Sequence, residues 1–180
     1  MRAKRATPPI RVPTTIIGRL FESGRGHTMI VVVQRVSRAE VRVEGEVVGK
    51  IELGLAVLVG VERGDGEADA DILARKLVAL RIFPGRTPMD LSIKDVHGAC
   101  LIVSQFTLAG STRKGNRPSF DRAEEPTLAR ALYERMAERV RAEGIEVATG
   151  RFAADMKVEL VNDGPVTFIL QARAGALAGD

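Results

Sequence analysis

The chain has 180 residues, of which 45% are hydrophobic and 28% are charged, and its formal net charge is +4. This length and balance are those of one soluble globular domain, and they exclude an intrinsically disordered chain. No apolar run approaches the roughly 20 residues of a membrane-spanning helix, which excludes a protein anchored by such helices. The single cysteine, Cys100, lies in an apolar run and cannot form an internal disulfide, which indicates a buried thiol in a cytoplasmic protein.

The first 28 residues differ in character from the rest of the chain. They hold six basic residues, one acidic residue and three prolines, a net charge of +5, and they lack the apolar centre of an export signal. The rest of the chain holds 21 basic and 22 acidic residues, so the folded body is expected to be nearly neutral. We therefore expect residues 1–28 to be a disordered basic extension or to precede the true initiator, Met29. Any RNA contact of the body must then come from local basic patches.

Apolar runs and turn residues predict the elements of the first half of the chain. Residues 29–36 are almost wholly apolar, as in a strand that is buried on both faces. Further strands are expected at 41–43, 47–51 and 55–61, and helical spacing from residue 72 predicts a helix that ends before Pro84.

The second half is expected to hold one more buried strand, a second helix and the closing strands. The strand covers residues 99–108 and leads into a loop over 110–122 that is rich in glycine, serine and arginine. Apolar residues then recur every four positions from Leu128 to Val140, which predicts the second helix, and Gly144 can cap it. Two or three short strands close the chain. This order predicts a single-domain α+β fold with a largely antiparallel sheet or roll and two main helices.

Several classes of catalytic site are excluded by residues that the sequence lacks. It has two histidines, His27 and His97, and neither belongs to a serine, histidine and aspartate pattern. It contains no HExxH, CxxC, GxGxxG or GxxxxGK[ST] motif. We therefore expect neither a metal ion nor a cofactor.

Polar residues next to apolar strands are the remaining candidates for a site. Strand ends of this kind bring amides and hydroxyls to one edge of a core. Taken singly, each is most simply a strand end with a turn. The candidates are Ser104, Gln105, Phe106 and Thr107 at the end of one strand, and Gly164, Pro165, Val166 and Thr167 at the start of another.

Taken together, the segments SQFTL at 104–108 and NDGPVT at 162–167 resemble the D-aminoacyl-tRNA deacylase family. The resemblance covers about residues 29–172, which are expected to form the deacylase domain between the extension at 1–28 and a flexible tail at 173–180. Further similar segments follow in the same order as in that family: MIVVVQRVSRAEV at 29–41, RIFP at 81–84, GNRPSF at 115–120 and GRFAADM at 150–156.

The resemblance implies a homodimer in which Gly164 and Pro165, joined by a cis peptide bond, reach from one subunit into the active site of the other. Their backbone carbonyls would crowd the position of an L side chain and so exclude L-aminoacyl substrates. The resemblance also implies that Arg35 supports this motif, with a surface charge at a strand end as the alternative. Phe152 and Met156 match positions near the terminal adenosine of the tRNA, with core packing as the alternative.

The role of Thr107 leaves two mechanisms open. A threonine hydroxyl is a weak nucleophile without an activating base, and we identify no histidine, lysine or terminal amine to activate Thr107. We favour attack by water, assisted by the vicinal ribose hydroxyl of the substrate. Backbone N–H groups of Phe106 and Thr107 would stabilise the oxyanion, and Ser104 and Gln105 would shape the pocket. A covalent ester on Thr107 is the alternative.

The leading hypothesis is an esterase that removes D-amino acids, and glycine, from aminoacyl-tRNA, with no membrane and no protein partner beyond its second subunit. Arg113, Lys114 and Arg117 form a basic loop suited to phosphates, although a solvated loop is the default for such residues. Two other classes stay open. One is a nucleic-acid-binding module without catalysis, and the other is a metal-free hydrolase of small acyl esters that does not need the RNA.

Overall fold

The computed structural model describes residues 28–113 and 115–178 of the chain. The expected extension therefore lies outside the described residues except for Thr28, and so does Lys114 of the basic loop. In chain order the elements are β1 (Met29–Val43), β2 (Glu46–Ile51), β3 (Gly54–Gly60), α2 (Glu67–Ala79), β4 (Ala99–Ser104), the 3₁₀ helix η1 (Phe106–Ala109), α3 (Pro126–Ala142), β5 (Glu146–Thr149), β6 (Met156–Arg173) and β7 (Ala176–Leu177).

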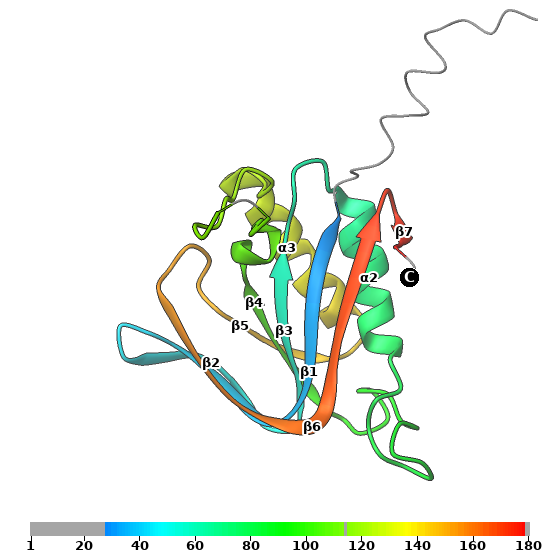
Figure 1. Cartoon of the computed structure of the whole chain (residues 1–180). Coiled ribbons are helices and arrows are strands. Elements are labelled where there is room, and N and C mark those ends of the chain that lie inside the picture. Colours follow the sequence, from blue (N-terminus) through cyan, green and yellow to red (C-terminus); the bar gives the residue numbers. More distant parts are fainter. Residues whose placement is uncertain (1–27, 114, 179–180) are drawn as a thin grey trace, which may run out of the picture.

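The strands form one curled sheet with both helices on the same side (Figure 1). Their order is β5-β4-β3-β1-β6-β7, and β2 pairs with β1. β3, β4 and β5 run parallel, whereas the pairs β1 with β2, β1 with β3, β1 with β6, and β6 with β7 are antiparallel. The expected α+β fold with a largely antiparallel sheet and two main helices is confirmed.

The main core lies between the sheet and the two helices. Met29, Val31 and Val33 of β1 point into it, together with Leu73 of α2 and Met136 of α3. The alternate residues of β1 are only partly buried on the other side of the sheet. The strand expected to be buried on both faces is thus fully buried on one, and it continues without a break to Val43.

The sheet curls because its longest strands bend. The second half of β1, with β2 and the first half of β6, turns over the ends of β3 and β4 (Figure 1). A second, smaller core fills the inside of this curl, with Val36 and Val41 of β1 packed in the same cluster as Leu101 and Val103 of β4. The carboxyl ends of β3 and β4 lie beside a cavity at the edge of the curled sheet.

Two segments differ from the expected elements. The strand predicted at 99–108 ends at Ser104, because residues 106–109 turn into η1. The closing strands from 156 onward are one strand, β6, in which the turn expected at 162–165 is a bulge. Asn162 pairs with Val36 and Thr167 with Gln34, so residues 163–166 stand opposite Arg35 alone.

The end of the chain folds back onto β6. β7 pairs with the last residues of β6, and the Ala178 N–H donates to the Gln171 carbonyl at 2.8 Å. The Gly175 N–H donates to a buried carboxylate oxygen of Asp69 on α2 at 2.8 Å. Part of the segment expected as a flexible tail thus forms β7 in the structure.

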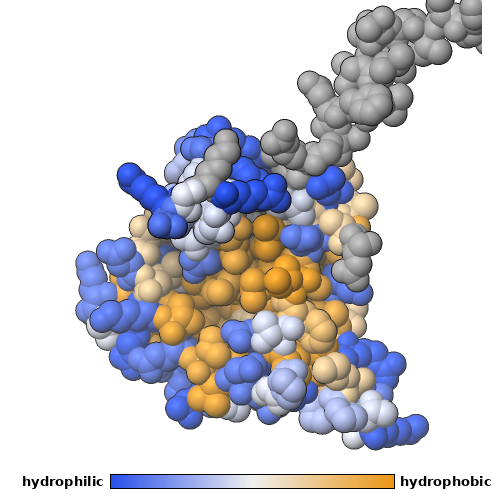
Figure 2. All heavy atoms as spheres, in the orientation of Figure 1, coloured by the Kyte–Doolittle hydropathy of each residue, from blue (hydrophilic) through white to orange (hydrophobic). Residues whose placement is uncertain are grey.

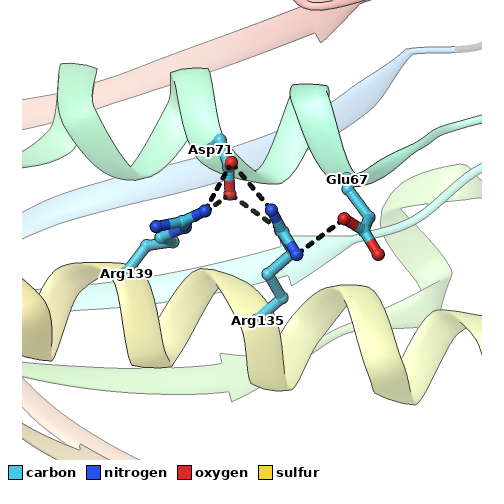
Figure 3. A network of polar contacts seen from close by, with 4 residues as sticks. All are labelled: Glu67, Asp71, Arg135 and Arg139. Carbon is cyan, nitrogen blue, oxygen red and sulfur yellow. Dashed lines mark hydrogen bonds and ion pairs between the residues drawn. The ribbon is translucent and has the colours of Figure 1, made fainter.

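A cluster of charged side chains joins the two helices (Figure 3). The carboxylate of Asp71 on α2 accepts two hydrogen bonds from Arg135 at 2.8 and 2.9 Å and two from Arg139 at 3.0 and 3.1 Å. Arg135 also lies 2.6 Å from Glu67. These guanidinium groups lower the pKa of Asp71 to about 2, with the hydrogen bond to Arg135 as the largest cause.

Candidate active site

A cavity of about 720 Å³ opens at the carboxyl ends of β3 and β4. Carboxyl ends of adjacent parallel strands are a common place for a ligand site, because the chain leaves the sheet there in loops. Its walls come from both strands, from η1, from the loop before α3, from α3 itself and from residues 152–158. Among its lining residues are Val59, Ser104, Gln105, Phe106, Phe120, Tyr133, Phe152 and Met156.

The chain turns at Gln105 and is held there by hydrogen bonds. The Gln105 N–H donates to the Val59 carbonyl at 2.7 Å, and its side-chain Nε2 donates to Thr107 Oγ1 at 2.6 Å. Gly60 permits the turn, since a Cβ at that position would lie 2.6 Å from Cβ of Leu108. The first N–H groups of η1, those of Phe106 and Thr107, have no partner inside the helix and remain available for a ligand.

Aromatic side chains form two walls of the cavity. Phe106 is 60% exposed, and its ring meets the edge of Phe120 with the centroids 5.1 Å apart. On the other side, the rings of Tyr133 and Phe152 are tilted at 6.1 Å. The Tyr133 hydroxyl donates to the Ile102 carbonyl at 2.9 Å, and burial raises the pKa of this hydroxyl to about 12. Tyr133 is therefore a neutral, fixed part of the wall.

Met156 begins β6 and lines the cavity beside Phe152. Its thioether packs closely on the backbone of Gly150, where a Cβ would lie 2.5 Å from the sulfur. Both Phe152 and Met156 are half-buried rather than fully buried. They can therefore contact a ligand in the cavity as well as the core.

The 163–166 bulge forms a second group of candidate residues. The Gly164–Pro165 peptide bond is cis, and both residues are exposed. Arg35 is only 8% exposed, so it is a buried residue and not a surface charge. Its Nε lies 2.8 Å from the carboxylate of Asp163 and donates to the carbonyl of the same residue at 3.0 Å. Asn162 closes the bulge by donating to the carbonyls of Arg35 and Val166.

The two groups lie at different places on the sheet. Ser104, Gln105, Phe106, Phe152 and Met156 line the cavity, and Thr107 adjoins it through its bond to Gln105. The lining residues do not include any of the bulge, and Arg35 pairs with Leu55 near the start of β3 rather than with its carboxyl end. Val166 is buried and Thr167, on the open side of the sheet, accepts a hydrogen bond from Gln34 at 3.2 Å. One chain alone does not bring Gly164 and Pro165 to the cavity.

Comparisons with known proteins identify the family of this chain. A family model described as D-Tyr-tRNA(Tyr) deacylase matches residues 32–171. The chain belongs to this family. Its curated relatives include the D-aminoacyl-tRNA deacylases of Pelobacter propionicus, 58% identical over 79% of this chain and 99% of the relative, and of Anaeromyxobacter dehalogenans, 58% identical over 81% of this chain and 98% of the relative. Family membership makes the protein a hydrolase that acts on ester bonds.

Two solved structures have the fold of this family member. The c-Myc DNA Unwinding Element Binding Protein aligns with a TM-score of 0.75 and 36% identity, over 81% of this chain and 99% of that chain. A probable eukaryotic D-amino acid tRNA deacylase aligns with a TM-score of 0.69 and 19% identity, over 81% of this chain and 100% of that chain. At that identity the second likeness concerns the fold alone.

In this family member, a buried carboxylate fixes the loop that closes the cavity. Glu62 is 1% exposed, and its Oε2 accepts from Arg122 at 2.6 Å and from the Thr28 N–H at 3.2 Å. The Arg63 N–H donates to the Arg122 carbonyl at 2.9 Å, and the Glu124 N–H donates to the Val61 carbonyl at 3.1 Å. The loop is thereby attached to the end of β3.

Several lining residues were not among the candidates from sequence. Phe120 belongs to the GNRPSF segment, so the family pattern already contained a signal for it. Tyr133 lies on the buried face of α3, where helical spacing suggests a core residue and gives no sign of a cavity. In the described part of the chain, no group of three or more histidine, cysteine, aspartate or glutamate residues is placed to hold a metal ion. No helix in that part is long and apolar enough to cross a membrane.

Proposed function

We propose that this protein hydrolyses the ester between a D-amino acid and the 3′ adenosine of tRNA, as a homodimer and without a cofactor. The observation that carries the proposal is the meeting of the 104–106 and 152–156 segments in one cavity of a chain that belongs to the deacylase family. We place the reaction in the cytoplasm, where aminoacyl-tRNA is used and where a single buried cysteine such as Cys100 stays reduced.

The cavity supports attack by water in preference to attack by Thr107. The side-chain Nε2 of Gln105 donates a hydrogen bond to Thr107 Oγ1. Because Nε2 is a donor, it cannot accept the proton that the Thr107 hydroxyl would lose as a nucleophile. The backbone N–H groups of Phe106 and Thr107 are suited to an oxyanion, and the vicinal ribose hydroxyl of the substrate assists the water. Ser104 and Gln105 shape the wall around the reacting ester.

The aromatic wall at the other side of the cavity suits the terminal adenosine. Phe152 and Met156 offer a ring face and a polarisable thioether, and both can pack on a base. Tyr133 supports Phe152 from behind with a hydroxyl that is already bonded to the backbone. The adenosine is thus the anchor, and the amino acid projects toward η1.

A second copy of the chain supplies the missing part of the site. The open side of the sheet carries Val32, Leu58 and Ile169 in neighbouring registers, and Ile169 is 66% exposed. Figure 2 shows hydrophobic side chains gathered over this open side. Apolar area of this kind marks an interface, and two-fold symmetry would carry Gly164 and Pro165 of one copy to the cavity of the other.

Selection against L substrates follows from this arrangement. The Gly164 and Pro165 carbonyls from the second copy crowd the side of the cavity where an L side chain would project, and they accept a hydrogen bond from the substrate amino group. Val166 and Thr167 continue the same segment into β6 and fix its position. Glycine lacks the excluded side chain, so glycyl-tRNA is a substrate as well.

Release of amino acid from four substrates tests the proposal. D-Tyr-tRNA and glycyl-tRNA should be hydrolysed, whereas L-Tyr-tRNA and a D-Tyr alkyl ester should be stable. Hydrolysis of the alkyl ester at a similar rate would instead favour a general hydrolase of small esters. Binding of tRNA without release of amino acid would favour a nucleic-acid-binding module, the alternative suggested by the basic loop.

The choice between water and Thr107 has its own experiment. Thr107→Ala should retain substantial activity, whereas D-Tyr-tRNA that ends in 2′-deoxyadenosine should be hydrolysed slowly. A covalent acyl ester trapped on Thr107 would reverse this preference.

A further inference from the structure

The loop between η1 and α3 keeps its charges of opposite sign largely in separate parts. Residues 110–120 include three basic residues and no acidic residue, whereas the acidic residues Asp121, Glu124 and Glu125 follow, the last two beside the cavity. Two of the three, Arg113 and Arg117, are described and exposed, and no ion pair among the described residues involves either. Their guanidinium groups are therefore available to an anionic partner.

The same loop lies at the mouth of the cavity. Ser111 and Ser119 exchange two backbone hydrogen bonds, at 2.7 and 2.9 Å, and so close the segment between them. Phe120, directly after this closure, lines the cavity and meets the ring of Phe106. Arg113 and Arg117 are thus only a few residues from the wall of the site.

The base of the loop is fixed to the end of β3 by an ion pair and backbone hydrogen bonds. Arg122 is held by the buried carboxylate of Glu62 at 2.6 Å, and backbone bonds join residues 61 and 63 to 124 and 122. Arg63, beside this anchor, lines the cavity, is exposed and has no ion pair in the described ranges. A loop whose ends are fixed loses less conformational entropy when it binds a ligand than a loop whose ends are free.

We propose that Arg113 and Arg117, with Arg63, bind phosphates of the RNA strand whose 3′ end occupies the cavity. The inference rests on the proposed function, because an adenosine held in the cavity must have its preceding phosphates outside the mouth. Arginine suits this role, since its planar guanidinium can donate two parallel hydrogen bonds to a phosphate and keeps its charge. Residues 29–180 are nearly neutral as a whole, so these arginines would provide the electrostatic attraction to RNA beside the reacting ester.

The test compares two double variants of the full chain that lose the same charge. Arg113→Gln with Arg117→Gln removes the cations of the loop, and Arg75→Gln with Arg86→Gln removes two exposed cations from α2 and the loop after it. The first pair should raise the KM for D-Tyr-tRNA about tenfold and leave kcat unchanged, and the second pair should change neither. Hydrolysis of D-Tyr-adenosine, which has no phosphate, should be the same in all three proteins.

Binding of uncharged tRNA at several salt concentrations gives a readout that does not depend on activity. Loss of both loop arginines should lower the slope of log affinity against log salt by about 2. If the wild type binds tRNA in this way but hydrolyses neither substrate, the proposed function fails and the phosphate site stands. Equal KM values and equal slopes for the two double variants would overturn the site. A loop variant that loses affinity only for an acidic polypeptide such as polyglutamate, and not for tRNA, would overturn it as well.

Discussion

Arg35 braces Asp163 through both the side chain and the backbone of that residue. Its Nε lies 2.8 Å from the carboxylate and donates to the carbonyl at 3.0 Å, and its Nη1 donates to the Ile82 carbonyl at 2.5 Å. The guanidinium therefore connects the 163–166 bulge to the segment that follows α2. A buried cation with several directed bonds fixes geometry, and here it fixes the segment that holds Gly164 and Pro165.

Replacing Arg35 by lysine should weaken chiral selection more than it weakens the fold. Lysine keeps the charge, but it cannot donate in the directions that reach both Asp163 and Ile82. We expect the rate ratio between D-Tyr-tRNA and L-Tyr-tRNA to fall about tenfold, with a loss of about 1 to 2 kcal/mol in the free energy of unfolding. Urea denaturation and deacylation of both enantiomers measure the two effects.

The matched control is Arg38→Lys, at an exposed arginine further along the same strand. It should leave stability and selectivity unchanged. If Arg35→Lys also leaves the rate ratio intact, the brace has no part in selection.

Ile169→Asp should separate the proposed dimer into monomers and abolish activity. A carboxylate at this 66% exposed position would be desolvated if a second copy covers the open side of the sheet. Met89→Asp is the control, because Met89 is an apolar residue that is 47% exposed in the loop between α2 and β4, outside the strands of the sheet. Sedimentation of each protein at several concentrations gives the oligomeric state. An Ile169→Asp variant that remains dimeric and active would place the interface elsewhere.

Periodicity and turn residues were sufficient for most of the fold. The apolar residues from 72 to 80 and from 128 to 140 placed both helices, and the alternation of Val166, Phe168 and Leu170 placed the end of β6. The order of elements then predicted the α+β class. These features are local, because each depends on which face of one element is buried.

Three features could not be read from local pattern. The early end of β4 depends on the Gln105 N–H reaching Val59 of a different strand. The bulge at 163–166 reads as a turn until its opposite strand is known, since only pairing reveals that Arg35 stands alone against it. Tyr133 became part of the cavity because α3 packs where β4 ends, a contact between elements far apart in the sequence.

The stability that Asp71 provides should disappear at low pH. Its pKa is lowered to about 2 from an ordinary value of 3.8, so the stabilisation is complete above pH 4 and is lost as the pH falls through 2. Asp71→Asn should cost about 1 to 2 kcal/mol at pH 7, allowing for solvent screening of a side chain that is 19% exposed. The difference between the two proteins should narrow from pH 4 downward in urea denaturation. Glu143→Gln, which breaks the exposed pair with Lys94, should have little effect at pH 7.

The environment of Asp65 raises the pKa of its carboxyl, whereas the environment of Asp71 lowers it. It is 6% exposed, its Oδ2 accepts from the Glu62 N–H at 2.7 Å, and its Oδ1 is buried without a hydrogen-bond partner among the described residues. Burial raises the pKa of this carboxyl to about 7, and the nearby carboxylates of Asp69, Glu62 and Glu124 raise it further, against the lowering effect of the Glu62 N–H. The folded state therefore holds an acid that the unfolded chain ionises more easily.

Asp65→Asn should stabilise the protein, and the gain should depend on pH. Because the folded pKa is raised, the native protein loses stability as the pH rises from about 4 to about 7, and the loss is constant above that range. Asparagine keeps an acceptor for the Glu62 N–H and cannot ionise, so the variant should gain about 1 to 3 kcal/mol at pH 8 and almost nothing at pH 4. Asp95→Asn is the control, because the pKa of that exposed carboxyl is lowered. Any change in stability on its replacement should therefore have the opposite sign. Urea denaturation at pH 4, 6 and 8 measures both variants, and an Asp65→Asn gain that is equal at all three values would show that ionisation of Asp65 is not its cause.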